Sequence, residues 1–191
     1  MRQLRLILKK LRTQLANNDF DFWSLDECHF QQHGSRCMMW VPPEDKDPIV
    51  LHEPTRKHIS IFGAVCIEKG TLVTQFSKIF NGTTFQEYLE LLLTHKSDSR
   101  CMHIILDNSR YHHALLLQPW LEKHNEEIKL DFLPPYSPEL NPIERVWKLT
   151  RRKCLHNVHF EQLYELTDAV ESPFTIWSNS SQSLRMICAI I

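Results

Sequence analysis

The sequence has little glycine, no paired cysteine motif and almost no net charge. It contains 4 glycines in 191 residues, with neither GxGxxG nor GxxxxGK[ST], so nothing supports a phosphate-cradling nucleotide fold. Its six cysteines are scattered without a CxxC, which favours buried free thiols in a reducing compartment over a disulfide framework. The 22 basic and 23 acidic residues give a net charge of −1, which excludes a general basic coating for nucleic acid.

Long apolar runs are missing as well. No stretch reaches the roughly 18 apolar residues that a membrane-spanning helix needs, and the basic N-terminus lacks the apolar segment of a signal peptide. Apolar residues nevertheless make up 42% of the chain and charged residues 24%, a composition typical of a globular protein with a real core. We therefore expect one domain, at most with a tail, and no membrane partner.

The apolar patterns predict a chain that mixes strands and helices. Strands are expected over residues 21–30, 36–41, 58–67, 71–76, 101–106 and 128–132. A capping box at Thr84–Glu87 predicts one helix, residues 110–124 another with a kink at Pro119, and residues 160–171 a last one closed by Pro173. An antiparallel meander followed by crossover units predicts a mixed sheet with helices on both faces.

The two ends of the chain differ from this central region. Residues 1–18 hold five basic residues and no acidic one, with leucines at helical spacing, which predicts a basic amphipathic helix. Such a helix is either docked on the domain surface or an arm for DNA or a partner. The serine-rich stretch 178–183 predicts a loose linker, so the domain is expected over 19–172 with a C-terminal tail over 173–191.

Three carboxylates stand where catalytic acids are often found. Asp26 lies on the first strand, Asp107 follows the buried strand 101–106, and Glu144 is the third residue of a helix expected to begin with Asn141 as its cap. Gathered carboxylates are typical of phosphoryl transfer with two Mg²⁺ ions. Each acid taken singly also has a structural explanation, because Glu144 suits a helix cap, Asp107 a turn and Asp26 a partly exposed strand position.

A long motif bears on this choice. Residues 133–147, LPPYSPELNPIERVW, resemble the LPPYSPxLNPIExxW signature of IS630-type transposases, in the Tc1/mariner superfamily. The segments around Asp26 and Asp107 resemble two other motifs of the same family. The resemblance covers about residues 20 to 170. The resemblance implies an α/β, retroviral-integrase-like (RNase H-like) fold with a mixed five-stranded sheet. It also implies that Asp26, Asp107 and Glu144 are the catalytic, metal-binding acids of a DDE endonuclease that uses two Mg²⁺ (or Mn²⁺) ions.

The same resemblance implies roles for neighbouring residues. The residues expected to support the site are Asn108, His112, Pro135, Tyr136, Asn141 and Pro142. A basic run on the helix of Glu144 is expected to contact DNA phosphates, unless it is only a solvated helix face. That run consists of Arg145, Lys148, Arg151, Arg152 and Lys153.

The function implied by the resemblance is cut-and-paste DNA transposition. The enzyme would cut a strand at the transposon end and join the freed 3′-OH to target DNA, at a TA dinucleotide in this superfamily. Family members carry an N-terminal helix-turn-helix region that this chain is expected to lack, which implies self-association or a DNA-binding partner encoded by an upstream frame. The expected location is the bacterial cytoplasm, with the nucleoid. The alternatives are a general RNase H-like metal-dependent nuclease and an inactive or regulatory fragment that pairs with full-length transposase.

Overall fold

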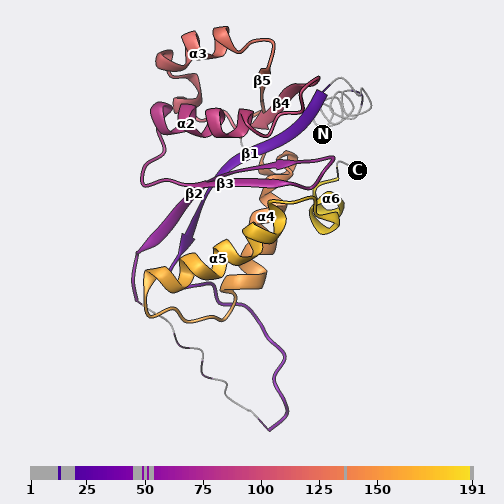
Figure 1. Cartoon of the computed structure of the whole chain (residues 1–191). Coiled ribbons are helices and arrows are strands. Elements are labelled where there is room, and N and C mark those ends of the chain that lie inside the picture. Colours follow the sequence, from indigo (N-terminus) through magenta and orange to yellow (C-terminus); the bar gives the residue numbers. More distant parts are fainter. Residues whose placement is uncertain are drawn as a thin grey trace.

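A five-stranded sheet between two layers of helices forms the body of the protein (Figure 1). The computed structural model describes residues 13, 20–44, 49, 51, 54–135 and 137–189. The strands are β1 (Phe20–Gln31), β2 (His58–Cys66), β3 (Leu72–Phe76), β4 (Cys101–Leu106) and β5 (Ile128–Phe132). Their order across the sheet is β3-β2-β1-β4-β5.

The sheet is mixed, as the sequence predicted. β1 pairs with β2 and β2 with β3 in antiparallel fashion, and this register sets Asp26 opposite Gly63. The pairs β1–β4 and β4–β5 are parallel, so each needs a crossover connection that the helical segments provide. β1 therefore lies at the centre of the sheet, and its successive side chains alternate between two covered faces.

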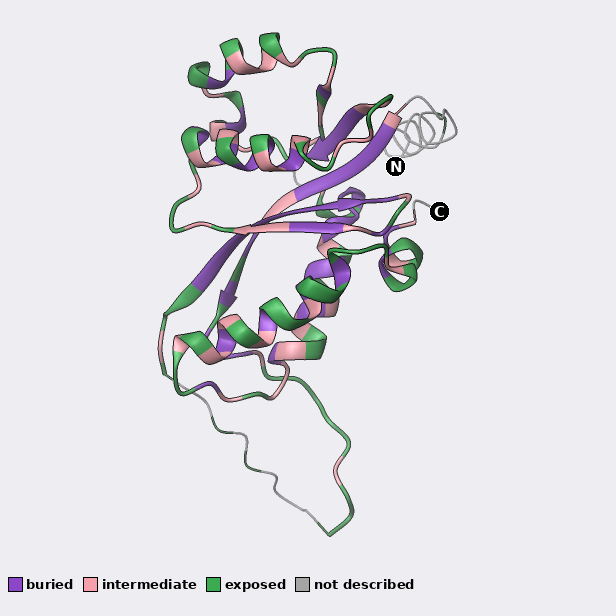
Figure 2. Cartoon of the chain, viewed as in Figure 1, coloured by how far each residue is buried: buried purple, intermediate pink, exposed green. Residues whose placement is uncertain are grey.

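Helices cover both faces of the sheet, as predicted. On one face α2 (Gly82–Leu93) and α3 (Gln118–Lys123) pack over a core that includes Phe62, Phe85 and Tyr88. On the other face α4 (Ile143–Thr150), α5 (Leu163–Trp177) and α6 (Gln182–Cys188) pack over Phe30, Trp147 and their neighbours. Figure 2 shows the central strands largely buried between these layers. A π-helical segment, η4 (Arg151–Leu155), extends α4.

A buried ion pair fixes the start of β1. The carboxylate of Asp21 is fully buried and lies 2.9 Å from Arg100 Nη1, while Ser97 N donates to it at 3.1 Å. Burial alone raises the pKa of Asp21, but the hydrogen bonds from Ser97 and the charges of Lys69 and Arg100 outweigh it and leave the pKa below its ordinary value. The loop between α2 and β4 is thereby tied to the edge of the core.

The strand predicted over residues 36–41 is wrong. This segment leaves the body as an extended loop in which Met38 and Trp40 are fully exposed. A strand needs a hydrogen-bonded partner, and in the described part of the chain no strand pairs with residues 36–41, although Ser35 just before them forms an isolated bridge with His156. The side chain of Asn157 anchors the start of the loop, because its Oδ1 accepts from Cys37 N at 3.0 Å and its Nδ2 donates to Cys37 O at 3.1 Å.

Two helix predictions need correction on the face covered by α2 and α3. The capping box of α2 is formed by Asn81 and Thr84, one turn earlier than Thr84–Glu87. Residues 110–124 form two 3₁₀ turns, η1 (Arg110–His113) and η2 (Leu115–Leu117), followed by the short α3, because Ala114 is extended. Pro119 lies in the first turn of α3, where its missing N–H is not needed, and so it does not kink a longer helix.

The C-terminal region belongs to the body and is not a loose tail. α5 continues through Pro173 to Trp177, since burial of Phe174 and Trp177 offsets the hydrogen bond that the proline removes. Ser181 caps α6, whose Leu184 and Cys188 are fully buried, so the linker predicted over 178–183 is wrong. Apart from Thr13, the helix expected over 1–18 lies outside the described residues. Within the described ranges, no helix combines the length and apolar character that crossing a membrane requires.

Candidate active site

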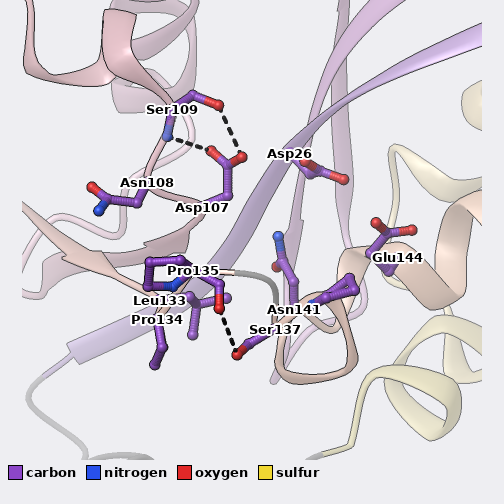
Figure 3. A pocket seen from close by; sticks show the side chains of 11 residues that line it. Asp26, Asp107, Asn108, Ser109, Leu133, Pro134, Pro135, Ser137, Asn141 and Glu144 are labelled. Carbon is purple, nitrogen blue, oxygen red and sulfur yellow. Dashed lines mark hydrogen bonds between the residues drawn. The ribbon is translucent and has the colours of Figure 1, made fainter.

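Asp26, Asp107 and Glu144 line one cavity of about 380 Å³ (Figure 3). Asp26 comes from β1, Asp107 from the residue after β4, and Glu144 from the first turn of α4. The remaining lining residues are Asn108, Ser109, Leu133, Pro134, Pro135, Ser137, Pro138 and Asn141. The structure therefore brings together the three acids that the sequence singled out from positions far apart in the chain.

Asp26 is the acid whose ionisation is most disturbed. Burial raises the pKa of Asp26 to about 8, and the nearby carboxylates of Glu27 and Glu144 add to this rise. Its Oδ2 accepts a hydrogen bond from Trp147 Nε1 at 3.1 Å, which lowers the pKa in part. Positive charge brought near such a carboxyl group favours its ionised form and so lowers its pKa. The cavity thus favours a cation.

Asp107 is held by three donors although half of its side chain is exposed. Ser109 N donates to Oδ1 at 3.1 Å and Ser109 Oγ to Oδ2 at 2.9 Å. His112 Nδ1 lies 3.2 Å from Oδ1, and the Nε2 of the same ring lies 3.0 Å from Glu27 Oε1. One ligand atom from each of Glu27, Asp107 and His112 falls within 4.8 Å of the others, so this cluster is a second candidate for cation binding.

The position of Glu144 depends on how α4 is fastened to β1. Ser24 Oγ accepts from Ile143 N at 2.9 Å and donates to Asn141 Oδ1, while Asn141 Nδ2 donates to Leu25 O at 3.0 Å. The side chain of Asn141 is thus committed to β1, and Pro142 occupies the N-cap position instead. The prediction that Asn141 caps this helix is wrong, but its contacts still fix the first turn that carries Glu144.

The basic run after Glu144 divides into two groups. Arg145 donates to the carbonyls of Ile187 and Ala189 at 2.8 and 2.9 Å and so satisfies the end of α6. Arg151 lies 3.0 Å from Cys28 Sγ and 5.4 Å from the ring centroid of Phe30. The remaining members of the run, Lys148, Arg152 and Lys153, are exposed.

The other expected residues are distributed around the cavity. Asn108 and Pro135 line it, His112 lies behind Asp107, and Pro142 is buried at the start of α4. Tyr136 lies outside the described residues. Three further residues support the site and were not predicted: Ser24, Glu27 and Gly63. The signals in the sequence were polar residues inside an apolar strand, for Ser24 and Glu27, and a glycine inside a strand, for Gly63.

A mixed sheet in this strand order, with acids from β1, β4 and the helix α4 around one cavity, defines an RNase H-like enzyme domain. The family model described as DDE superfamily endonuclease matches residues 21–167. The chain therefore belongs to the DDE superfamily of endonucleases. It is also 38% identical over 101 residues to the uncharacterised protein y4pE/y4sA of Sinorhizobium fredii (strain NBRC 101917 / NGR234), a match that covers 53% of this chain and 71% of that protein.

Solved structures of the Mos1 mariner transposase share the fold. The pre-cleavage Mos1 transpososome superposes with a TM-score of 0.70 at 15% identity, over 96% of this chain and 56% of that one. The Mos1 paired-end complex with left transposon end gives a TM-score of 0.69 at 18% identity, over 96% of this chain and 55% of that chain. The catalytic domain of Mos1 gives a TM-score of 0.61 at 15% identity, over 96% of this chain and 82% of that chain. The chain spans about half the length of the longer Mos1 chains, and the RNase H-like fold expected from the sequence is confirmed.

Proposed function

We propose that this chain is the catalytic domain of a cut-and-paste DNA transposase of the IS630 type. The observation that carries the proposal is the convergence of Asp26, Asp107 and Glu144 on one cavity, within a domain of the DDE endonuclease superfamily. The substrate is DNA, first the end of the transposable element and then target DNA at a TA dinucleotide. The transposase signature at residues 133–147 supports this choice over a general nuclease, since it supplies both the connector and the start of α4.

The three acids suit divalent cations. Their donor atoms are carboxylate oxygens, the ligands that Mg²⁺ and Mn²⁺ take readily, and the pKa of Asp26 at about 8 reflects burial beside other carboxylates. We assign Asp26, Asp107 and Glu144 as the residues that hold two such ions. When bound, the ions activate the attacking oxygen and stabilise the leaving oxygen of the phosphodiester. Some solved Mos1 complexes are described as containing Mn or Mg, which agrees with this assignment.

The chain's own residues position the reacting groups. Ser109 and His112 hold Asp107, Trp147 holds Asp26, and the bonds between Ser24, Asn141 and β1 hold the turn of Glu144. Half of the Asp107 side chain remains exposed, so a DNA strand reaches the acids from the open side of the cavity. The attack of water cuts the strand, and the freed 3′-OH then attacks target DNA in the same cavity.

DNA contacts are assigned to the basic run, which consists of Arg145, Lys148, Arg151, Arg152 and Lys153. Lys148, Arg152 and Lys153 come first in this assignment, since Arg145 and Arg151 also contact other parts of the chain. These cations reach phosphates and give affinity without reading bases. Sequence recognition would come from another part of the transposase, either through self-association or through a DNA-binding partner encoded upstream. Residues 1–18 are kept as a proposed N-terminal segment, and the catalytic body, expected over 19–172, is proposed to continue through the rest of α5 and α6. The site of action is the bacterial nucleoid.

The direct test is strand cleavage by the purified chain with Mg²⁺ or Mn²⁺ on supercoiled plasmid. Asp107→Asn should reduce nicking by at least about 10³-fold, because cleavage depends on metal-activated water. Asp98→Asn, at an exposed loop position, is the matched control and should cleave like the parent. Unchanged nicking by folded Asp107→Asn would refute the assignment.

A second assay separates the candidate activities. Joining of a pre-cut transposon end to a target plasmid distinguishes a transposase from a general nuclease, which cuts without joining. A folded parent chain that neither cuts nor joins with either metal would identify an inactive or regulatory fragment.

A further inference from the structure

Glu27 lies on the opposite side of β1 from the acid beside it. Successive strand residues point to opposite faces, so Asp26 faces α4 while Glu27 faces the layer of α2 and η1. The side chain of Glu27 is only 11% exposed and its Oε1 lies 3.0 Å from His112 Nε2. A buried carboxylate of this kind is costly unless it has a partner, and the partner here is a ring that also touches a cavity acid.

The ring of His112 is fixed on all sides. Its side chain is completely buried, with its centroid 4.4 Å from the rings of both Phe85 and Tyr111. Nδ1 lies 3.2 Å from both the main-chain carbonyl and the carboxylate Oδ1 of Asp107. Because both of these groups are acceptors, Nδ1 carries the hydrogen and donates toward Asp107. Glu27 then sets the rotation of the ring from the far side.

The contacts leave Asp107 oriented but still able to bind. Oδ1 receives Ser109 N and His112, whereas Oδ2 receives Ser109 Oγ alone (Figure 3 shows the Ser109 contacts). A carboxylate oxygen has two acceptor positions, so Oδ2 retains one that faces away from these donors. The side chain stands at the end of β4 and is half exposed, so without these contacts it would rotate among several rotamers.

We propose that Glu27 and His112 are positioning residues that orient Asp107 for cation binding from behind the sheet. The inference rests on the proposed function, since it assumes that Asp107 holds a cation. Glu27 is not itself a ligand in this assignment. The alternative, in which Glu27, Asp107 and His112 together bind the ion, becomes an outcome of the test.

Three variants separate positioning from charge and from direct ligation. Glu27→Leu removes the hydrogen bond but keeps similar volume, on the strand face where Leu25 is buried, so the fold should hold. Glu27→Gln removes the charge but keeps a side-chain amide, which hydrogen-bonds His112 Nε2 through its N–H when Nε2 is an acceptor and through its oxygen when Nε2 carries a hydrogen. Glu122→Ala, at an exposed position of α3, is the control for loss of a carboxylate elsewhere.

The measurement is Mn²⁺ binding to the full chain by calorimetry, with thermal unfolding recorded for each variant. Glu27→Leu should raise the Mn²⁺ dissociation constant about tenfold or more, as loss of the partner behind a metal ligand does elsewhere. Glu27→Gln should stay within about threefold of the parent, because it restores the hydrogen bond without the charge. Glu122→Ala should bind like the parent.

The outcomes that overturn the inference differ from those that overturn the function. Folded Glu27→Leu with parental Mn²⁺ affinity would show that Asp107 needs no such support. Equal losses in Glu27→Gln and Glu27→Leu would show that Glu27 acts through its charge or as a ligand. In both cases the parent chain would still bind Mn²⁺ and cut DNA. If Glu27→Leu fails to fold, His112→Gln carries the same test and should raise the dissociation constant likewise. A parent chain without Mn²⁺ binding and cleavage would overturn the proposed function as well.

Discussion

Replacing Gly63 with alanine would disturb the site from a residue that does not itself line the cavity. Gly63 lies opposite Asp26 in the β1–β2 pair, under the ring of Trp147. A Cβ at this position would stand 2.2 Å from Trp147 Cη2 and 2.7 Å from Cζ2. Ordinary carbon contacts are about 3.5–4.0 Å, so the ring or the strand must move by more than roughly 1 Å.

The ring has little room to move. Trp147 is 1% exposed, and its ring packs edge to face against Phe30 at 6.0 Å and near Phe174 at 6.2 Å. Overpacking of a filled core costs about 1–3 kcal/mol, and we expect the upper half of that range. Without the clash, alanine would be slightly favourable in a strand, by about 0.5–1 kcal/mol over glycine. The steric cost exceeds this gain, so Gly63→Ala should destabilise the protein.

The same displacement would reach the acids. Trp147 Nε1 donates to Asp26 Oδ2 at 3.1 Å, and Glu144 lies on the same helix as the ring. A misplacement of about 1 Å near reacting groups can cost on the order of 10²-fold in rate. We expect Gly63→Ala to lower the free energy of unfolding by about 2 kcal/mol and plasmid nicking by about 10²-fold, as measured by urea unfolding and the cleavage assay.

A double-mutant cycle isolates the contact. Trp147→Phe removes the outer ring atoms that the new Cβ would meet, so Gly63→Ala in that background should change stability by less than about 0.5 kcal/mol. The hydrogen bond to Asp26 is absent from both members of that pair and cancels. An equally large loss in the Trp147→Phe background would refute the argument that the ring is the obstacle.

Three further variants test other parts of the fold and site. Ser24→Ala should lower the free energy of unfolding by about 2 kcal/mol, because a buried amide of α4 loses its acceptor; a loss below about 0.5 kcal/mol in urea unfolding would contradict this. Asp21→Asn should cost about 2 kcal/mol at pH 7, since Arg100 loses its charged hydrogen bond to Asp21 but keeps Glu68 as a partner. Because the pKa of Asp21 lies below its ordinary value, the stabilisation by Asp21 is present above about pH 4 and is lost as the pH falls through the pKa of the folded state. The difference in melting temperature between parent and variant should therefore narrow in acid, and a constant difference would contradict this prediction. Joint replacement of Arg152 and Lys153 by glutamine should weaken DNA binding for all sequences and reduce the salt slope by about 2 in fluorescence anisotropy, whereas an unchanged slope would remove them from the DNA surface.

The core strands were predictable because their signals are local. The apolar runs at 58–67 and 101–106 predicted β2 and β4, and Gly70, with a φ of +65°, lies in the turn between β2 and β3. The segment 36–41 contains a similar apolar run but pairs with no strand among the described residues, and no local pattern records the lack of a partner. The prediction that Pro173 ends the helix was wrong for the same reason. The residues that bury α5 and keep it intact are distant in the sequence.

The site followed the same division. The acids were visible because each stands beside a strong local signal, a strand or the motif at 133–147. Their supports were not, since Ser24 meets Asn141 across 117 positions and Glu27 meets His112 across 85. A polar residue in an apolar strand indicates that it has a hydrogen-bond partner, but the identity of that partner depends on the register of the sheet.

The register of β1 consequently determines the geometry of the whole site. Ser24, Asp26 and Glu27 bond to α4 through Ile143, to Trp147 and to His112 respectively. A shift of one residue would exchange the two faces, placing Glu27 in the cavity and Asp26 in the apolar layer of α2. Two pairings prevent this shift: the antiparallel pairing with β2 runs from Trp23 to Gln31 and includes Asp26 and Glu27, and the parallel pairing with β4 runs from Phe20 to Ser24. Substitutions along β1 share these contacts, so their effects on stability and cleavage should be non-additive.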